Sequence, residues 1–218
     1  YESFFLLADY QVSDYADNIP WIRWGLWEVA LDWLAVGLDP ERSHFIIESG
    51  VPAFAELTIH LSWFLGIGHL QRTPTLKAEM RDLEEKTKTL PVAFFNYPVM
   101  QIANILLPKA HLVPVGDDQL PHIEMTRDMA QSFNNTYGEV FPLPKPRLDA
   151  GAKVPGIDGQ KMSKSYNNAI EIFQEGKPLR KRVMSIVTDS TPLEEPKNPE
   201  GCNVFALYKL FFTEAEQE

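Results

Sequence analysis

The residues best suited to chemistry form a pentapeptide from Lys161 to Ser165, with the sequence Lys-Met-Ser-Lys-Ser. Gly156 and Gly159 lie shortly before it. The lysine ammonium groups carry positive charge on flexible stems, and the serine hydroxyls and backbone N–H groups add neutral donors. Such a set of donors can bind a polyphosphate and stabilise charge that develops on it. Lysines at this spacing are also common on solvated surfaces, so the pentapeptide alone leaves both interpretations open.

A second group of polar residues lies in the helix that the apolar spacing predicts over residues 92–107. Tyr97, Gln101 and Asn104 stand at positions i, i+4 and i+7, so they share one helix face. Polar groups between apolar neighbours on such a face form either a buried hydrogen-bond network or a ligand site. The spacing does not decide between the two.

A third candidate is the segment Gly116-Asp117-Asp118-Gln119, which follows an apolar strand and precedes a helical pattern that extends to about Phe133. A strand, a glycine with acidic residues and then a helix is the local form of a nucleotide site. The glycine lets the backbone approach a ligand, and a carboxylate can hold ribose hydroxyls. An Asp at a helix start is also an ordinary cap, so the signal is moderate.

These candidates must be positioned by a fold in which strands and helices alternate. Apolar runs typical of buried strands occupy residues 4–8, 45–47 and 112–115. Helical patterns occupy residues 22–34, 92–107 and a stretch from Pro52 to Gly66 or Gly68. The alternation predicts the α/β class with a parallel sheet, both faces of which are buried. Gln11, after the first strand, then lies at the carboxyl edge of the sheet, where such folds bind ligands.

The remaining segments have simpler interpretations. Trp24, Trp27 and Trp33 in the first helical pattern are interpreted as core or interface residues. The charged segment 72–90 is predicted to be exposed, with Lys77 as the candidate exception. The other expectations are a surface connector over 142–146, helices over 170–173 and 179–187, a linker over 191–201 and a helix over 205–218.

Length and composition restrict the class of protein. A chain of 218 residues with 44% hydrophobic residues can form one sizeable domain, or one domain and part of another. No apolar run reaches the roughly 18–20 residues that a membrane span needs. The single Cys202 excludes an internal disulfide and an all-cysteine metal site, and it fits a cytoplasmic location. The five histidines lack metal-ligand spacing, so no metal site made of protein ligands is expected.

The charge balance argues against a protein that coats nucleic acid non-specifically, since 20 basic and 30 acidic residues give a net charge of −10. A local basic face remains compatible with nucleic-acid binding. Such a group is formed by Lys177, Arg180, Lys181 and Arg182. A solvated helix face is the commoner explanation of such a group.

Both ends of the sequence suggest a piece of a longer protein. The chain begins within the predicted first strand and stops within a helical pattern, whereas natural domains rarely open on a core strand without a lead-in. We therefore expect the parallel sheet to lack its first strand.

Four segments in a fixed order carry a family resemblance: Leu6–Asp9, the pair Tyr97-Pro98 with Gln101, Val113–Gln119, and Lys161–Ser165. Together they resemble the tryptophanyl-tRNA synthetases, a family of class I aminoacyl-tRNA synthetases. The resemblance extends from Phe4 to about Gly201, and the last two segments are its most specific parts. It implies a Rossmann-like catalytic domain over 1–155, an ATP-phosphate loop with following helices over 156–190, and over 191–218 a linker and the start of a helical anticodon-binding domain.

The resemblance also implies an activity and partners. The activity is ATP-dependent activation of L-tryptophan, with Mg²⁺ on the pyrophosphate, followed by transfer to tRNA(Trp) in translation. The family works as a cytoplasmic homodimer.

Carried over by position, the resemblance assigns roles to individual residues. The ammonium and carboxylate end of the amino acid would be bound by Tyr97 and Gln119. The side-chain pocket would be lined by Gln11, Gln101, Val113 and Val115. ATP would be met by Gly116 and Asp118 at the ribose, by Met162 at the adenine, and by the loop serines Ser163 and Ser165. The phosphates would be neutralised by Lys77, Lys161 and Lys164.

The chain departs from the family pattern in two places. The family's N-terminal strand with its His motif has no counterpart in this sequence, which implies that the chain by itself is weakly active or inactive. Asn104 stands where most of the family carries Asp to accept the indole N–H. A neutral amide accepts more weakly than a carboxylate, so tryptophan recognition should be looser by about 1 kcal/mol, or the substrate preference should shift.

Two other functions stay open. A tyrosyl-tRNA synthetase has a related site, in which Asn104 would face the phenol hydroxyl, although the segment Val113–Gln119 favours the tryptophan family. A non-catalytic paralogue could use the pocket to sense an aromatic amino acid or to bind a partner. The complete phosphate loop with Lys161 and Lys164 argues against the paralogue, because a sensor has no need of it.

Overall fold

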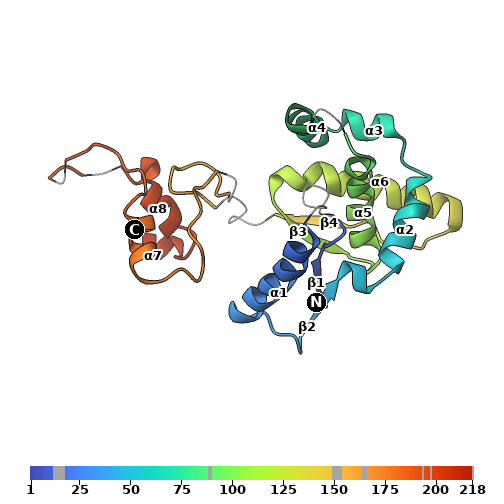
Figure 1. Ribbon diagram of the computed structural model, residues 1–218, viewed down its shortest axis with the longest axis horizontal. Coiled ribbons are helices and arrows are strands. Elements are labelled where there is room, and N and C mark those ends of the chain that lie inside the picture. Colours follow the sequence, from blue (N-terminus) through green and yellow to red (C-terminus); the bar gives the residue numbers. More distant parts are fainter. Residues whose placement is uncertain are drawn as a thin grey trace. The chain divides into compact units, whose positions relative to one another are not determined.

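The computed structural model divides the chain into two compact units, Tyr1–Arg147 and Leu148–Glu218 (Figure 1). The three-part division expected from the sequence stays a prediction. The structure describes residues 1–11, 18–87, 90–148, 154–163, 166–192, 194–196 and 198–217.

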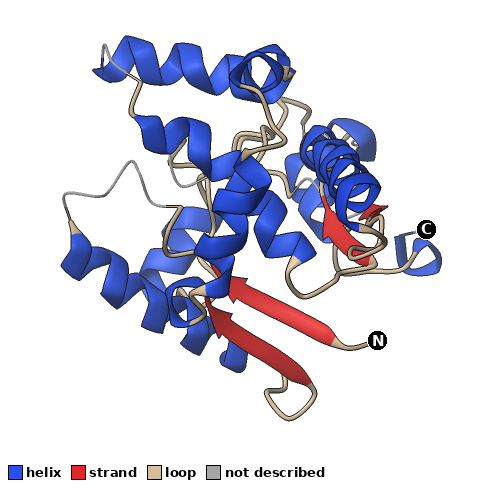
Figure 2. Ribbon diagram, turned by 90° about the vertical axis from the view of Figure 1, so that its right-hand side faces the viewer, coloured by secondary structure: helices blue, strands red, loops and turns tan. Residues whose placement is uncertain are grey.

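The first unit opens with a β-α-β arrangement. Strands β1 (Ser3–Leu7) and β2 (Ser43–Ile47) pair in parallel (Figure 2). Ser3 lies opposite Ser43 and Leu7 opposite Ile47. Helix α1 (Ile19–Ala35) connects them, and its N-cap Asn18 accepts a hydrogen bond from the backbone N–H of Trp21. A helical crossover between parallel strands is what the alternating pattern predicted.

The prediction that the strands are buried on both faces was wrong. Phe4 and Ile47 each expose 42% of their surface. Helix α1 packs against the pair through Trp33, whose ring lies 5.7 Å from that of Phe5 and 5.5 Å from that of Phe45. Because the described sheet has two strands, alternate side chains remain at its surface.

Helix α5 (Val92–Leu106) is the centre of the first unit. It packs against α2 (Ala53–Ser62) and α6 (Leu120–Tyr137), as Figure 1 shows. Two further helices, α3 (Ile67–Arg72) and α4 (Pro74–Thr87), complete the same core. The core residues are Leu61, Leu70, Leu76, Val99, Ile102, Ala103, Leu106, Met125, Met129 and Ala130. The prediction that the charged segment 72–90 is exposed was wrong at Thr73 and Leu76, which are buried.

A second small sheet joins β3 (Leu112–Val115) to β4 (Lys145–Leu148). The prediction of a surface connector over 142–146 was therefore wrong at Lys145 and Pro146, which belong to β4. The backbone N–H of Lys145 donates to the carbonyl oxygen of His111 at 2.9 Å, and this pairing converts the segment into a strand. The parallel-sheet class was predicted correctly, but the described strands form two pairs and not one sheet.

The second unit contains α7 (Gly176–Val183), α8 (Asn203–Tyr208), α9 (Glu214–Gln217) and a single turn at Pro199–Gly201. The helix expected over 170–173 was wrong, because the carbonyl oxygen of Ala169 accepts from Arg182 Nε at 2.7 Å and not from a helical N–H.

Two other helix predictions for this unit were wrong in their bounds. Helix α7 stops before 187, where Val187 N–H donates to the Ile157 carbonyl oxygen at 2.7 Å. The single helix expected over 205–218 is divided into α8 and α9 by a new start at Thr213. There the backbone N–H and the hydroxyl of Thr213 both donate to the Glu216 carboxylate, as in a capping box.

Candidate amino-acid and nucleotide site

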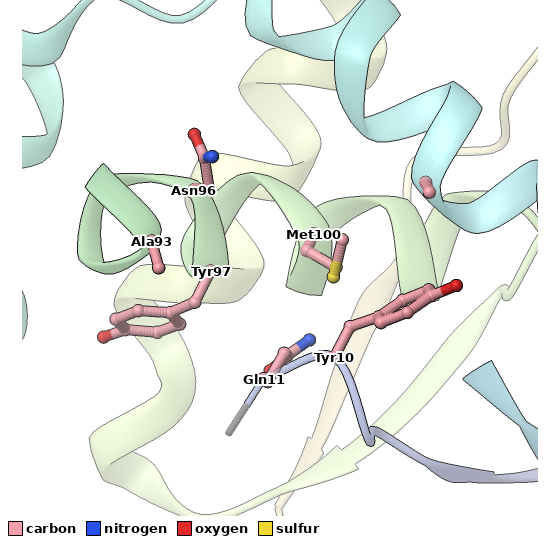
Figure 3. Close-up of a pocket in the computed structure, with 7 residues that line it drawn as sticks. Tyr10, Gln11, Ala93, Asn96, Tyr97 and Met100 are labelled. Atoms are coloured by element: carbon pink, nitrogen blue, oxygen red, sulfur yellow. The ribbon is translucent and has the colours of Figure 1, made fainter. Parts of the chain in front are cut away.

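A cavity of about 260 Å³ lies where the carboxyl end of β1 meets α5 and α2. Open α/β sheets bind ligands at this edge because polar residues and loops gather there. Figure 3 shows Gln11 and Tyr10 facing the side of α5 that carries Tyr97 and Met100. The wall is formed by Tyr10, Gln11, Ala55, Ala93, Asn96, Tyr97 and Met100.

Tyr97 is held by a carboxylate from the neighbouring helix α4. Its hydroxyl donates to Glu79 Oε2, and burial together with this hydrogen bond raises the pKa of the Tyr97 phenol. The phenol therefore stays neutral, and its oxygen retains lone pairs that can accept from a ligand.

Two predicted sites meet in a short chain of amides. Gln101 Nε2, on α5, donates to Gln119 Oε1 at 3.3 Å, and Gln119 Nε2 donates to Asp118 Oδ2 at 3.3 Å. Gln119 and Asp118 belong to the 3-10 turn Asp117–Gln119, which leads directly into α6. The helix face and the nucleotide-like turn, separate in the sequence, thus form one polar surface.

Glu48 is the deepest charged residue of this region and was missed by the sequence analysis. It follows β2 directly, and none of its surface is exposed. Its Oε2 accepts from the Tyr10 backbone N–H at 2.9 Å. Burial raises the pKa of the Glu48 carboxyl, while hydrogen bonds from Asn104, Tyr10 and Gln11 oppose the rise. The sequence analysis predicted Gln11 from its position after a strand. Glu48 also follows a strand, so the same signal could have predicted it.

His122 is a second residue that the sequence analysis missed. It is buried on α6, with its ring 6.5 Å from that of Tyr97. Burial lowers the pKa of its imidazole, and the charges of Glu79 and Asp118 oppose this effect. No sequence signal identified it, because its neighbours come from other helices.

The other residues predicted for the first unit lie outside the wall of this cavity. Val113 and Val115 are half-buried on one face of β3, and extended Gly116 leads into the turn at Asp117. Lys77, which the sequence analysis gave as the candidate exception to an exposed segment, is itself exposed on α4, so that expectation was wrong. Asn104 lies one helical turn beyond Met100, and its Oδ1 is buried without a hydrogen-bond partner among the described residues.

In the second unit, Asn168 shapes the approach to the predicted phosphate loop, Lys161–Ser165. Its Oδ1 accepts from the Ser163 backbone N–H at 2.7 Å, and its Nδ2 donates to Lys161 O at 3.1 Å. The same Nδ2 donates to Asp158 at 2.9 Å, which lowers the pKa of that carboxyl. Met162 N–H donates to Val154 O at 2.8 Å. The predicted residues Lys164 and Ser165 lie outside the described residues.

The predicted basic group is smaller than the sequence suggests. Lys177, Arg180 and Lys181 are exposed on α7. Arg182 instead donates from Nη2 to the Asn167 carbonyl oxygen at 2.8 Å, in addition to its bond to Ala169. Arg182 therefore has a structural role in this unit.

The described residues also bear on two other kinds of site, clusters of metal-ligating side chains and helices that could cross a membrane. No group of three His, Cys, Asp or Glu side chains among the described residues could hold a metal ion. None of the described helices is both long and apolar enough to cross a membrane.

Comparison with known proteins identifies the class. Residues 26–217 match the family of tRNA synthetases class I (W and Y), and the chain belongs to this family. Within it, the chain is 44% identical over 220 residues to the tryptophan–tRNA ligase of Rhodopirellula baltica, covering 100% of this chain and 67% of that protein. It is 46% identical over 215 residues to the tryptophan–tRNA ligase of Fusobacterium nucleatum, covering 97% and 64%.

A solved structure gives the same result for the fold. The tryptophanyl-tRNA synthetase of Campylobacter jejuni, complexed with ADP and tryptophan, superposes with a TM-score of 0.84 at 39% identity, covering 99% of this chain and 67% of that one. This confirms the α/β class I synthetase fold predicted from the sequence. The chain spans about two thirds of the length of these relatives.

Proposed function

We propose that this protein activates L-tryptophan with ATP and transfers it to tRNA(Trp). The observation that carries the proposal is the cavity at the carboxyl end of β1, with Gln11 and Tyr97 in its wall, in a chain 44–46% identical to tryptophan–tRNA ligases. A mostly apolar cavity with few polar groups is suited to an aromatic amino acid.

The amino acid's charged end is assigned to Tyr97 and Gln119. Because the Tyr97 hydroxyl donates to Glu79, its oxygen can accept from the ammonium group, and the Glu79 carboxylate adds a favourable charge. Gln119 is linked to Gln101 and presents an amide that can donate to the substrate carboxylate. Gln11, Gln101, Val113 and Val115 are assigned to the side chain, with Asn104 accepting the indole N–H.

ATP is assigned to Gly116 and Asp118 at the ribose, to Met162 at the adenine, and to Ser163 and Ser165 of the loop. Lys77, Lys161 and Lys164 would neutralise the phosphates. A Mg²⁺ ion would be held mainly by phosphate oxygens, which is its usual mode in such sites.

The reaction needs no nucleophile from the protein. A substrate carboxylate oxygen attacks the α-phosphorus, the bond from that phosphorus to the bridging oxygen of the β-phosphate breaks, and pyrophosphate leaves with the electron pair. Positioning and charge neutralisation then determine the rate. Lysines that contact the leaving pyrophosphate more strongly as its charge develops favour the transition state over the ground state.

The test is amino-acid-dependent ATP–pyrophosphate exchange on the full-length protein, with tryptophan and tyrosine in parallel. Exchange with tryptophan alone is expected. Exchange with tyrosine would assign the protein to the sister enzyme instead. Exchange with neither would leave the non-catalytic paralogue.

The proposed assembly is a homodimer in the cytoplasm. Support for the dimer comes from α1, where none of the side chains is fully buried and Trp21, Trp24 and Trp27 expose 46%, 58% and 71% of their surface. Exposed aromatic groups in such number are typical of an interface. The single Cys202 fits a reducing compartment.

A further inference from the structure

Glu48 is a buried carboxylate that the proposed reaction does not use, and it interacts with three groups around the cavity. Its Oε2 accepts from the Tyr10 backbone N–H at 2.9 Å, whereas its Oε1 is buried and has no hydrogen-bond partner among the described residues. The side chains of Gln11 and Asn104 lie close enough to the carboxylate to lower its pKa. Tyr10 and Gln11 belong to the cavity wall. One carboxylate therefore connects the end of β1 to helix α5.

The Glu48 carboxylate beside Asn104 favours one orientation of the Asn104 amide. An ionised carboxylate can only accept hydrogen bonds, so the amide must donate from its NH₂ group. The Asn104 Oδ1 is then the atom directed away from Glu48. This oxygen is buried and has no partner among the described residues.

A buried acceptor without a partner is costly unless a ligand provides a donor. Asn104 shares a face of α5 with Tyr97, seven residues earlier, and lies one turn beyond Met100 in the cavity wall. A ligand whose charged end lies at Tyr97 would extend its side chain toward Asn104. The donor that matches Oδ1 is a single N–H on an otherwise apolar ring.

We propose that Glu48 is the positioning residue for substrate specificity, because its carboxylate holds the Asn104 amide with Oδ1 available to the ring N–H of the substrate. This inference rests on the proposed function. It also changes the expectation that a neutral Asn104 weakens tryptophan recognition. The negative charge of Glu48 lies next to the Asn104 amide and polarises it. Asp9 is the other charged group that acts on Glu48.

Glu48→Gln tests the proposal because glutamine has nearly the same size but can donate. Its NH₂ group would compete for Asn104 Oδ1, so the amide loses its fixed orientation. Binding of L-tryptophan and of L-β-(benzothiophen-3-yl)alanine, in which sulfur replaces the indole N–H, is measured by calorimetry. We expect tryptophan affinity to fall about tenfold, as for one lost hydrogen bond, and the affinity of the sulfur analogue to change less than about twofold.

A second pair of variants controls for simple damage to the fold. Asn104→Asp alone places two carboxylates together and should also weaken tryptophan binding at neutral pH. Glu48→Gln with Asn104→Asp exchanges the amide and the carboxylate, so the introduced glutamine would donate and the introduced carboxylate would accept the indole N–H. The double variant should regain tryptophan affinity to within about threefold of the original protein, with strong non-additivity.

The outcomes separate this inference from the proposed function. If the unmodified protein binds no tryptophan, the proposed function fails. If the unmodified protein binds tryptophan, two results would overturn the role of Glu48. One is that Glu48→Gln lowers the affinity for both ligands equally or for neither, and the other is that the double variant does not regain tryptophan affinity.

Discussion

At the scale of single residues, the candidate site depends on polar side chains that hold one another. The clearest pair is Tyr97 on α5 and Glu79 on the preceding helix α4. The neutral phenol of Tyr97 donates to the Glu79 carboxylate. The phenol oxygen is thereby oriented before any ligand arrives, and prior orientation reduces the entropy that binding must cost.

Replacement of Tyr97 by Phe should weaken tryptophan binding about tenfold or more. The variant loses the acceptor for the ammonium group and leaves Glu79 without its donor, each a loss on the order of 1 kcal/mol. Calorimetric titration with tryptophan measures the effect. Tyr137→Phe is the matched control, because Tyr137 is 56% exposed at the end of α6; equal losses in both variants would contradict the role of Tyr97.

Glu48→Gln should raise thermal stability at neutral pH while it weakens binding. Burial raises the pKa of Glu48 above its ordinary 4.5, so the folded chain holds a proton that the unfolded chain has already lost. Stability from this group is therefore greatest below 4.5 and declines as the pH rises through the higher folded pKa.

Melting temperatures of the two proteins between about pH 4.5 and 7.5 test this sign. Glutamine does not titrate, so the variant should melt a few degrees higher at about pH 7.5, and the gap should shrink as the pH falls. If the Glu48→Gln variant melts below the original protein by the same amount at every pH, the Glu48 side chain stabilises the fold and this prediction is wrong.

The sequence predicted those site residues whose signal is local. Helical spacing placed Tyr97, Gln101 and Asn104 on one face, and the strand-turn-helix pattern identified Asp118 and Gln119. Glu79 and His122 could not be predicted, because their partners come from other helices and only the tertiary fold brings them together. Even within the predicted set, the bond between Gln101 and Gln119 was not foreseen.

At the scale of elements, the approach to the proposed phosphate loop depends on a close contact between Gly156 and Asn168. A Cβ added at Gly156 would overlap Asn168 Nδ2 and would lie 2.9 Å from the Asn168 carbonyl oxygen. Asn168 is buried and carries the bonds to Lys161 and Ser163. The glycine is therefore required by packing and not only by chain flexibility.

Gly156→Ala should destabilise the second unit by about 1–3 kcal/mol, the usual cost of overpacking. Displacement of Asn168 breaks the hydrogen bond to the Ser163 N–H, so this amide should exchange with deuterium faster. Gly201→Ala is the control, because nothing lies within 4 Å of a Cβ built at that position. Unchanged protection of the Ser163 amide in Gly156→Ala would refute the proposed contact.

Elements were predicted well where apolar periodicity is strong and poorly where side chains compete with the backbone. Strands β1, β2 and β3 and helix α5 lie close to the predicted positions. The helix expected over 170–173 is absent, and the carbonyl of Ala169, which would accept the first helical N–H, accepts from Arg182 instead. Strand β4 was missed because Pro146 and its charged neighbours are unusual in a strand.

At the scale of the whole molecule, helix α1 exposes several large apolar side chains. Trp33 covers the sheet, whereas Trp24 and Trp27 stay exposed. Exposed tryptophans of this kind dominate the energy of interfaces when they become buried. In the proposed dimer, a second copy of the chain would bury these tryptophans.

Replacement of Trp24 and Trp27 by Gln should therefore raise the dissociation constant of the dimer about tenfold or more. Sedimentation equilibrium of the full-length protein measures it. The fold of each subunit should be preserved, because neither ring belongs to the buried core. Trp63→Gln is the matched control: Trp63 is also 67% exposed but follows α2 and packs edge-on against His60. If the original protein is monomeric, or if the control dissociates as readily, α1 is not the dimer interface and its tryptophans must contact another part of the protein.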